Sequence, residues 1–374
     1  MRLNLIIREK QIKTTILGLF FAILLHYIGN FPSFVENWYA LGFYPLFANL
    51  LRSMVGWLPF SVGDLVYLLL GYWVLVQLIK GLLKLYHQGF SLDLSLQFAG
   101  TFIRFFCWGY ILFQLFWGLN YSRLGIANQL DISKKGYSKE DVTALTRALI
   151  DKTNNYRKAL KDSNLPQMPL QAIFQEAVHD YENIAMVYPF LQYKKPAVKI
   201  SLFTPIADYI GYSGYYAPLT GEAQLRDDLP RILIPYITCH EIAHQLGYAS
   251  ESEANFVGYL AASSSNNHYF NYSVYLDLLG YALGEEFLQY AKDSSNFKIY
   301  ETVVQYNRSH IDSLVKKDRK EIRQFFLNRR NSFSPVSASL YNQFLMFNKQ
   351  IAGMNSYDEV IGWLIAFQKK YGKL

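Results

Sequence analysis

The chain has 374 residues, of which 51% are hydrophobic and only 17% are charged. This balance is typical of a protein that lies partly in lipid and still has enough chain for one sizeable globular region. Much of the formal net charge of +7 lies beside apolar segments, without a basic stripe or a Cys/His finger, so we predict no nucleic-acid partner. The two cysteines, Cys107 and Cys239, are too few for a disulfide framework, and Cys239 is expected to pack as a small apolar residue.

Three apolar segments occupy the N-terminal third of the chain, at about residues 14–31, 65–83 and 98–119. Each is long enough to cross a bilayer as a helix. A cleaved signal peptide is the alternative for the first segment, but no small-residue cleavage pattern follows it. The aromatic segment between the first two, residues 38–60, is interrupted by prolines and is predicted to lie in the membrane interface. Residues 1–122 therefore form the predicted transmembrane region, with the lipid bilayer as a partner.

The distribution of lysine and arginine predicts the orientation of these spans. Basic residues precede the first span and flank the turn between the second and third, whereas Arg52 is the only basic residue between the first two spans. Because cytoplasmic loops are enriched in lysine and arginine, the N-terminus is expected in the cytoplasm. Three spans then place residues 123–374 outside the cytoplasm, as an extracytoplasmic domain.

Polar, amphipathic segments follow the third span. Ser138-x-x-Asp141 predicts a capped helix to about residue 160, and a second helix is expected over 171–187. Residues 197–203 alternate as in a strand. The glycine- and tyrosine-rich stretch 211–221 is interpreted as a strand pair with a turn, which could bind an extended substrate by strand addition or could simply be an aromatic loop packed on the core.

The sequence His240-Glu241-Ile-Ala-His244 carries the strongest chemical signal in the chain. On a helix, the two histidines lie one turn apart on one face, where both can bind a single zinc ion. Glu241 would lie beside the open coordination position and take a proton from the water that the metal activates.

The flanking residues predict where this helix begins and ends. Asp227 and Asp228 are expected to start it, and Pro230 is tolerated in its first turn. Gly247 is expected to end it as a residue in the left-handed conformation.

A third ligand is expected from the next helix. Ser250-x-x-Glu253 is interpreted as a capping box, which would occupy Glu253 and leave Glu251 free to face the histidines. Glu251 is therefore the predicted third ligand, in preference to Glu253, with Asn255 behind it as a hydrogen-bond partner. The alternative is that both glutamates only favour the N-terminus of a helix.

The remaining segments predict closing helices. They cover residues 274–291, 300–306, 309–330, 336–349 and 357–370, the last two lying on either side of Gly353. The charged residues within 309–330 are interpreted as a solvated helix face, with a contact to anionic headgroups as the alternative.

The run from His240 to Gly247, followed by Glu251-Ser-Glu-Ala-Asn-Phe256, resembles the gluzincin class of metallopeptidases, in which a glutamate from a second helix completes the zinc site. It is also similar to a bacterial domain-of-unknown-function family of zincin-like multi-pass membrane proteins, marked by an HELAHQ-G run and then E-x-EANF. The resemblance covers most of the chain. It implies a mainly α-helical, α+β zincin-like domain after the membrane region, Zn²⁺ as cofactor, and a location in the bacterial inner membrane.

These features together predict a membrane-anchored zinc metallopeptidase that hydrolyses an extracytoplasmic peptide or protein, with Glu241 as the general base. The alternative is a non-catalytic, zinc-binding scaffold or partner-binding protein of the cell envelope, although a structural site needs no base between its histidines. Five residues are candidates for steadying the oxyanion, and the sequence does not choose among them: Tyr215, Tyr216, Tyr341, Tyr357 and His268.

Overall fold

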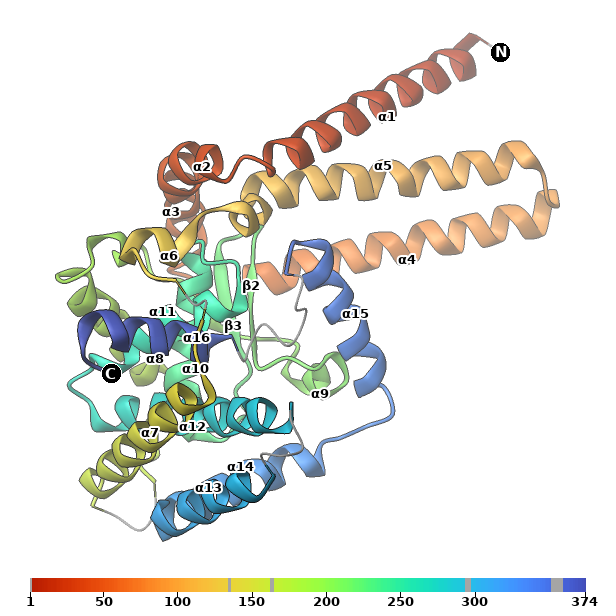
Figure 1. Ribbon diagram of the computed structural model, residues 1–374. Coiled ribbons are helices and arrows are strands. Elements are labelled where there is room, and N and C mark those ends of the chain that lie inside the picture. Colours follow the sequence, from red (N-terminus) through yellow and green to blue (C-terminus); the bar gives the residue numbers. More distant parts are fainter. Residues whose placement is uncertain (1, 134–135, 162–164, 293–296, 351–358) are drawn as a thin grey trace. The chain divides into compact units, whose positions relative to one another are not determined.

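Helices dominate the computed structural model of the protein, which describes residues 2–133, 136–161, 165–292, 297–350 and 359–374 (Figure 1). The chain divides into two compact units. The first comprises Met1–Leu124 together with Ala217–Glu222, and the second comprises Gly125–Tyr216 together with Ala223–Leu374.

The first unit contains the three predicted apolar helices. They are α1 (Arg2–Ile28), α4 (Val62–Gln88) and α5 (Leu92–Phe116). Each includes a segment long and apolar enough to cross a membrane, and few of the side chains in these segments are buried. The first and third helices end at Ile28 and Phe116, slightly before the predicted ends at 31 and 119, and residues Gly118–Ser122 form the short helix η2.

The aromatic segment between the first two spans is more regular than its prolines suggested. Its elements are α2 (Pro32–Phe34), the π-helix η1 (Val35–Phe43) and α3 (Tyr44–Val55). Pro45, which lacks an N–H, directly follows the π-helical turn of η1, in which Tyr44 N donates to Tyr39 O. Glu36 on η1 forms a buried ion pair with Arg123, at 2.9 Å, which joins this segment to the residues after α5.

The beginning of α4 depends on a residue distant in sequence. Ser61 is the N-cap and accepts a hydrogen bond from the Asp64 N–H. The carboxylate of Glu222, in the part of the β2–β3 hairpin that belongs to the first unit, accepts hydrogen bonds from Val62 N and Gly63 N at 3.2 and 2.6 Å. These contacts satisfy three N–H groups that have no partner within the helix.

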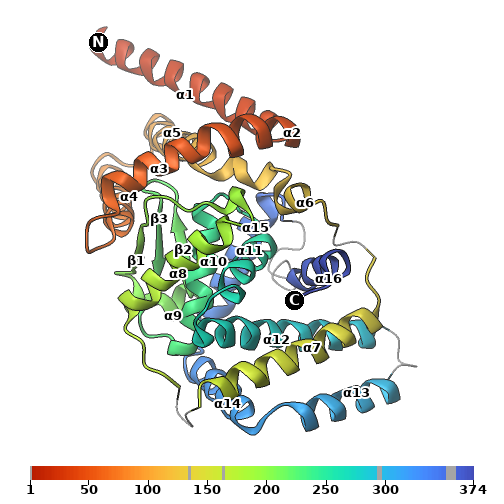
Figure 2. The ribbon, with the colours of Figure 1, turned by 90° about the vertical axis from the view of Figure 1, so that its left-hand side faces the viewer.

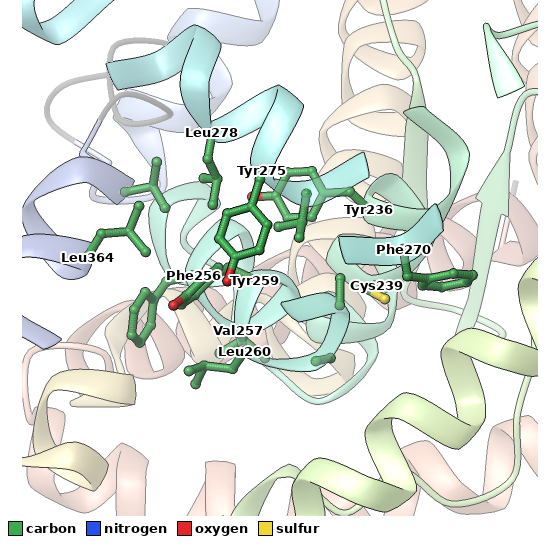
Figure 3. Close-up of a cluster of buried hydrophobic side chains, with 14 of the residues drawn as sticks. Tyr236, Cys239, Phe256, Val257, Tyr259, Leu260, Phe270, Tyr275, Leu278 and Leu364 are labelled. Carbon is green, nitrogen blue, oxygen red and sulfur yellow. The ribbon is translucent and has the colours of Figure 1, made fainter. Parts of the chain in front are cut away.

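The second unit is built around one hydrophobic core. Its major helices are α7 (Lys139–Ala159), α8 (Leu170–Ala185), α10 (Ile234–Gln245), α11 (Glu251–Ser263), α12 (His268–Ala291) and α16 (Val360–Tyr371). The predicted capping box of Ser138 and Asp141 is confirmed at the start of α7. Figure 3 shows the centre of the core, where Cys239 of α10 and Phe256 of α11 are completely buried. Cys239 is thus a packed apolar residue, as predicted.

A small sheet adjoins these helices. Its strands are β1 (Val198–Ile200), β2 (Gly214–Ala217) and β3 (Glu222–Leu225), in the order β1-β3-β2. β1 pairs in parallel with β3, Lys199 lying opposite Gln224. The strand at 197–203 was predicted. The pair expected within 211–221 is shifted, because Gly211 ends a short helix and the second strand follows the turn.

Shorter helices connect these elements. They are α6 (Gly125–Leu130), η3 (Pro189–Leu191), η4 (Thr204–Ile206), α9 (Ala207–Ile210) and η5 (Arg231–Leu233). Towards the C-terminus come α13 (Phe297–His310), α14 (Ser313–Asn328) and α15 (Ser334–Phe347). α7, α12 and α13 lie side by side (Figure 2). The beginning of the last predicted helix, at 357, and Gly353 lie outside the described residues.

Candidate metal centre

The helix that carries the two histidines begins later than predicted. α10 starts at Ile234, after the short turn η5, and Pro235 lies in its first turn. Asp227 and Asp228 do not start it, because Pro230 is extended (φ −51°, ψ 123°) and interrupts the helical path. Asp228 instead binds Arg226, at 2.6 Å. A partner provided by the tertiary structure outweighs the local capping signal.

The end of this helix fixes the orientation of His244. Gly247 has the predicted left-handed conformation, with φ of +87°. Its N–H donates to His244 O and that of Tyr248 donates to Ala243 O, which together form a Schellman motif. This reversal brings the carbonyl of Tyr248 to 2.7 Å from His244 Nδ1. Because a carbonyl only accepts, Nδ1 carries a proton, so in its neutral form the imidazole would present the lone pair of Nε2.

The second helix approaches the first very closely. A Cβ atom at Gly258 of α11 would lie 3.0 Å from the backbone nitrogen of His240 and 3.1 Å from its Cα. A larger residue would need the backbone of α10 to shift by a few tenths of an ångström, so glycine suits this close approach of α11 to the histidine helix. Glu251 is the first residue of α11 and its side chain is buried.

Three side-chain atoms converge as a result. Glu251 Oε2 lies 3.3 Å from His240 Nε2 and 3.5 Å from His244 Nε2. Ligand atoms bound to a tetrahedral zinc ion lie about 3.4 Å from one another, given bonds of about 2.1 Å. His240, His244 and Glu251 are all buried, and their ligand atoms lie within 4.8 Å of one another. In the part of the chain that the structure describes, this is the one such group that could hold a metal ion.

The closeness of the three side chains also shifts the pKa values of Glu251 and His244. Burial alone would raise the pKa of Glu251, but the neighbouring His244 and His240 hold that pKa well below its usual value. Burial would lower the pKa of His244, but Glu251 outweighs it and raises the pKa to about 9. The carboxylate is thus ionised, and a bound cation would complement its charge.

Glu253 has a different partner from the one predicted. Its Oε1 accepts a hydrogen bond from Ile126 N, at 2.8 Å, in the first turn of α6. Ser250 is the N-cap of α11, but its side chain makes no capping hydrogen bond and lies beside Ser252 Oγ instead. The capping-box prediction is therefore wrong for Ser250, although the structural role assigned to Glu253 fits its contact with α6.

The candidate base lies against the sheet. A Cβ atom at Gly214, the first residue of β2, would lie 2.5 Å from Glu241 Oε1. Glu241 is buried, and its Oε2 has no hydrogen-bond partner among the described residues. Burial raises the pKa of Glu241 to about 7, against the opposing effect of the two histidines. A carboxylate with this pKa can both accept and return a proton near neutral pH.

One of the oxyanion candidates contacts the group formed by His240, His244 and Glu251. Tyr341, on α15, donates a hydrogen bond to Glu251 Oε1 at 2.6 Å. Tyr215 lies beside Ser201 Oγ, and His268 packs near Tyr156. The further candidates are Tyr216, which is buried on β2, and Tyr357, which lies outside the described residues. Asn255, predicted to support the ligands, has an Nδ2 atom without a hydrogen-bond partner among the described residues.

Gly214 and Gly258 were missed by the sequence analysis. Each acts by leaving out a side chain where another element approaches. A single sequence contains no signal for such an approach, because nothing near either glycine indicates which distant element it will meet.

The fold and the site define the class of this protein. It is mostly helical, with three apolar helices near its N-terminus and a buried group of two histidines and a glutamate. Comparison with models of protein families shows which family the chain belongs to. The model of the family described as "Protein of unknown function (DUF3810)" matches residues 39–365, and the chain belongs to this family. No curated protein and no solved structure matches the chain.

Proposed function

We propose that this protein is a membrane-anchored zinc metallopeptidase with His240, His244 and Glu251 as the metal ligands. The observation that carries the proposal is the spacing of the three ligand atoms, 3.3 and 3.5 Å from Glu251 Oε2 to the two Nε2 atoms. Two imidazoles and one carboxylate, with the fourth position left for substrate or water, are the ligand set of catalytic rather than structural zinc sites. When bound there, Zn²⁺ would supply a Lewis acid that polarises a carbonyl and makes water more acidic.

Glu241 has the position and environment of a general base. Its carboxylate lies beside the ligand group, and burial brings its pKa to about 7. In the proposed reaction Glu241 takes the proton of the attacking water and then passes it to the leaving amine nitrogen. A purely structural metal site would not require an ionisable group buried at this point.

We further propose that the substrate peptide lies along β2. This strand forms one edge of the described sheet, and its first residue contacts the candidate base. An extended peptide added to this edge would bring a peptide bond towards Glu241 through main-chain hydrogen bonds. Main-chain hydrogen bonds do not depend on the side chains of the peptide, so this mode of binding suits a peptidase with a polypeptide substrate.

The proposed location is the bacterial inner membrane, with the second unit outside the cytoplasm. The lysine and arginine distribution around the three apolar helices supports this orientation. To test the orientation, a reporter enzyme that works only outside the cytoplasm is fused after Leu374, and we expect it to be active. Activity of a reporter that works only in the cytoplasm, fused at the same point, would overturn the orientation.

The experiment that tests the function measures zinc content and peptide hydrolysis in the detergent-purified full chain. We expect about one zinc ion per chain, lost in His240→Ala and Glu251→Ala. Glu253→Ala is the matched control for Glu251 and should retain zinc, because its carboxylate binds Ile126 N instead. Glu241→Gln should retain zinc and lose turnover.

The alternative function, a non-catalytic zinc-binding scaffold, predicts a different result. Zinc would be present and would depend on the same ligands, but Glu241→Gln would have no activity to remove. A wild-type protein that binds no zinc would overturn both.

A further inference from the structure

We propose that Tyr341 is a positioning residue that holds Glu251 as a ligand through one oxygen only. The inference rests on the proposed function, because it concerns the same metal site. It assigns a role to a helix, α15, that lies far from the H-E-x-x-H motif in sequence.

The two oxygens of Glu251 have different surroundings. Oε2 lies 3.3 and 3.5 Å from the Nε2 atoms of His240 and His244, and it has no hydrogen-bond donor among the described residues. Oε1 accepts a hydrogen bond from the hydroxyl of Tyr341, at 2.6 Å. A short hydrogen bond between a hydroxyl and a carboxylate is among the stronger hydrogen bonds in proteins. Tyr341 therefore keeps Oε1 turned away and directs Oε2 towards the histidines.

The chemical consequence concerns the number of ligand atoms. A carboxylate can bind a metal ion through one or both of its oxygens. If Oε1 also turned towards the histidines, it would occupy the position that a catalytic site leaves for water or substrate. The hydroxyl of Tyr341 opposes that rotation. It also restricts the Glu251 side chain before the metal binds, which reduces the entropy lost on binding.

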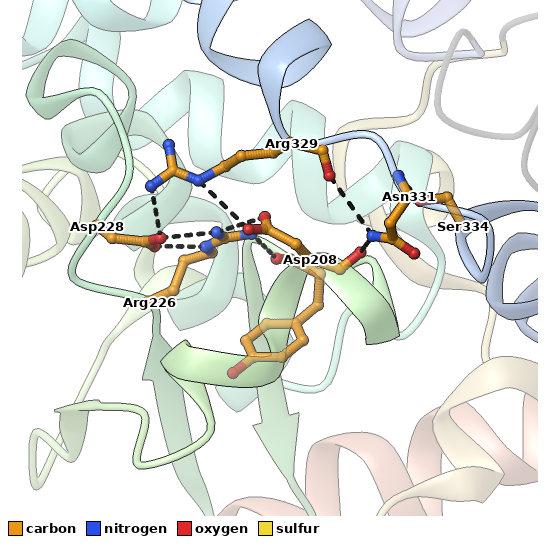
Figure 4. A network of polar contacts seen from close by, with 7 residues as sticks. Asp208, Arg226, Asp228, Arg329, Asn331 and Ser334 are labelled. Carbon is orange, nitrogen blue, oxygen red and sulfur yellow. Dashed lines mark hydrogen bonds and ion pairs between the residues drawn. The ribbon is translucent and has the colours of Figure 1, made fainter.

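The placement of Tyr341 depends on a polar network at the base of α15 (Figure 4). The buried guanidinium of Arg226, at the end of β3, binds Asp228 and Asp208 at 2.6 and 2.7 Å. Arg329 binds the same two carboxylates, at 3.2 and 3.3 Å. Asn331, just before α15, donates to Asp208 O at 2.8 Å.

This network ties the connection between α14 and α15 to the sheet and to the segment that precedes α10. α15 extends from that anchor, and Tyr341 lies two turns along it, where its hydroxyl contacts Glu251. The contact is thus determined from two sides, by the start of α11 and by the anchored base of α15.

The test compares Tyr341→Phe with the wild-type full chain in detergent. The affinity for Zn²⁺ is measured by competition with a chelating indicator, and Co²⁺ is used in parallel because its visible absorption reports the number of ligands. We expect the Zn²⁺ dissociation constant to rise about 10- to 100-fold, as when other groups that orient metal ligands are removed. The Co²⁺ bands should change in intensity, since the second oxygen becomes free to bind. The matched control is Tyr300→Phe on α13, which should change neither quantity.

The outcomes separate this inference from the proposed function. Zinc binding that is tight and equal in wild type and Tyr341→Phe, with identical Co²⁺ spectra, would overturn the role of Tyr341 and leave the peptidase proposal intact. A wild-type protein that binds no zinc would overturn both. If Tyr341→Phe does not fold, Tyr341→Gln, which keeps a donor, is compared with Tyr341→Leu, which has none. Equal zinc affinity in that pair would overturn the inference.

Discussion

The pair α10–α11 and the helix α15 contribute to the same group of side chains, but they are held in different ways. α10 and α11 are almost wholly buried and approach to backbone contact at Gly258. α15 exposes large apolar side chains such as Leu340 and Phe347, at 62% and 69%, and is tied by a polar network at its base. The proposed ligands thus come from the buried core, and Tyr341, the proposed positioning residue, comes from a helix with exposed apolar side chains. Damage to the first region should abolish metal binding, and damage to the second should weaken it.

The largest effect is expected from Gly258→Ala. The added methyl group would meet the backbone of His240 at 3.0 to 3.1 Å, so that backbone must shift by a few tenths of an ångström and carry the His240 side chain with it. We expect a loss of about 1–3 kcal/mol in the free energy of unfolding, together with loss of zinc. The matched control is Gly280→Ala on α12, where a Cβ atom meets nothing within 4 Å. Equal unfolding temperatures and equal zinc content for the two variants would contradict the close approach.

Gly214→Ala should act on turnover without removing the metal. The new Cβ atom would overlap Glu241 Oε1, at 2.5 Å, and displace the carboxylate of the candidate base. Because a misplacement of about 1 Å can reduce a rate by about 10²-fold, we expect kcat to fall about 10- to 100-fold. Zinc content, measured on the same preparation, should stay at the wild-type value. A wild-type kcat in this variant would show that Glu241 is not placed by β2.

A smaller effect is expected from Arg329→Gln at the base of α15. The change removes ion pairs with Asp208 and Asp228, but Arg226 still binds both carboxylates. Surface ion pairs contribute about 0–1 kcal/mol, so the Zn²⁺ dissociation constant should rise only about two- to fivefold, less than in Tyr341→Phe. The neighbouring exposed Arg330→Gln is the matched control. A larger loss than in Tyr341→Phe would show that the base of α15 contributes more than Tyr341 itself.

The smallest effect concerns a buried acid on α8, which packs against α10. Asp180 is 1% exposed, and burial raises its pKa from 3.8 to about 7. Between these values the folded protein holds a proton that the unfolded chain has lost, so stability falls as the pH rises through this window. Asp180→Asn should remove part of that decline, so that the variant melts a few degrees above wild type at pH 8 and close to it at pH 4. Melting curves that run parallel to wild type across this range would contradict the raised pKa; Asp151→Asn, on an exposed side chain, is the control.

Much of the fold could be predicted because its signals are local. The apolar length of the three N-terminal helices and the box of Ser138 and Asp141 each act within one segment. Gly247 likewise ends α10 as predicted. The predictions that were wrong concerned residues with partners far away in sequence. Asp228 binds Arg226 and Arg329 instead of starting a helix, and Glu253 accepts a hydrogen bond from Ile126.

The sequence by itself determined the chemistry that this protein can offer. The helical repeat places His240 and His244 one turn apart, and Glu241 between them, because these relations depend on backbone geometry alone. The tertiary structure decided which groups join them. The close contact at Gly258 brings Glu251 to the histidines, and α15 brings Tyr341 to Glu251. Such contacts exist only after distant segments have packed together.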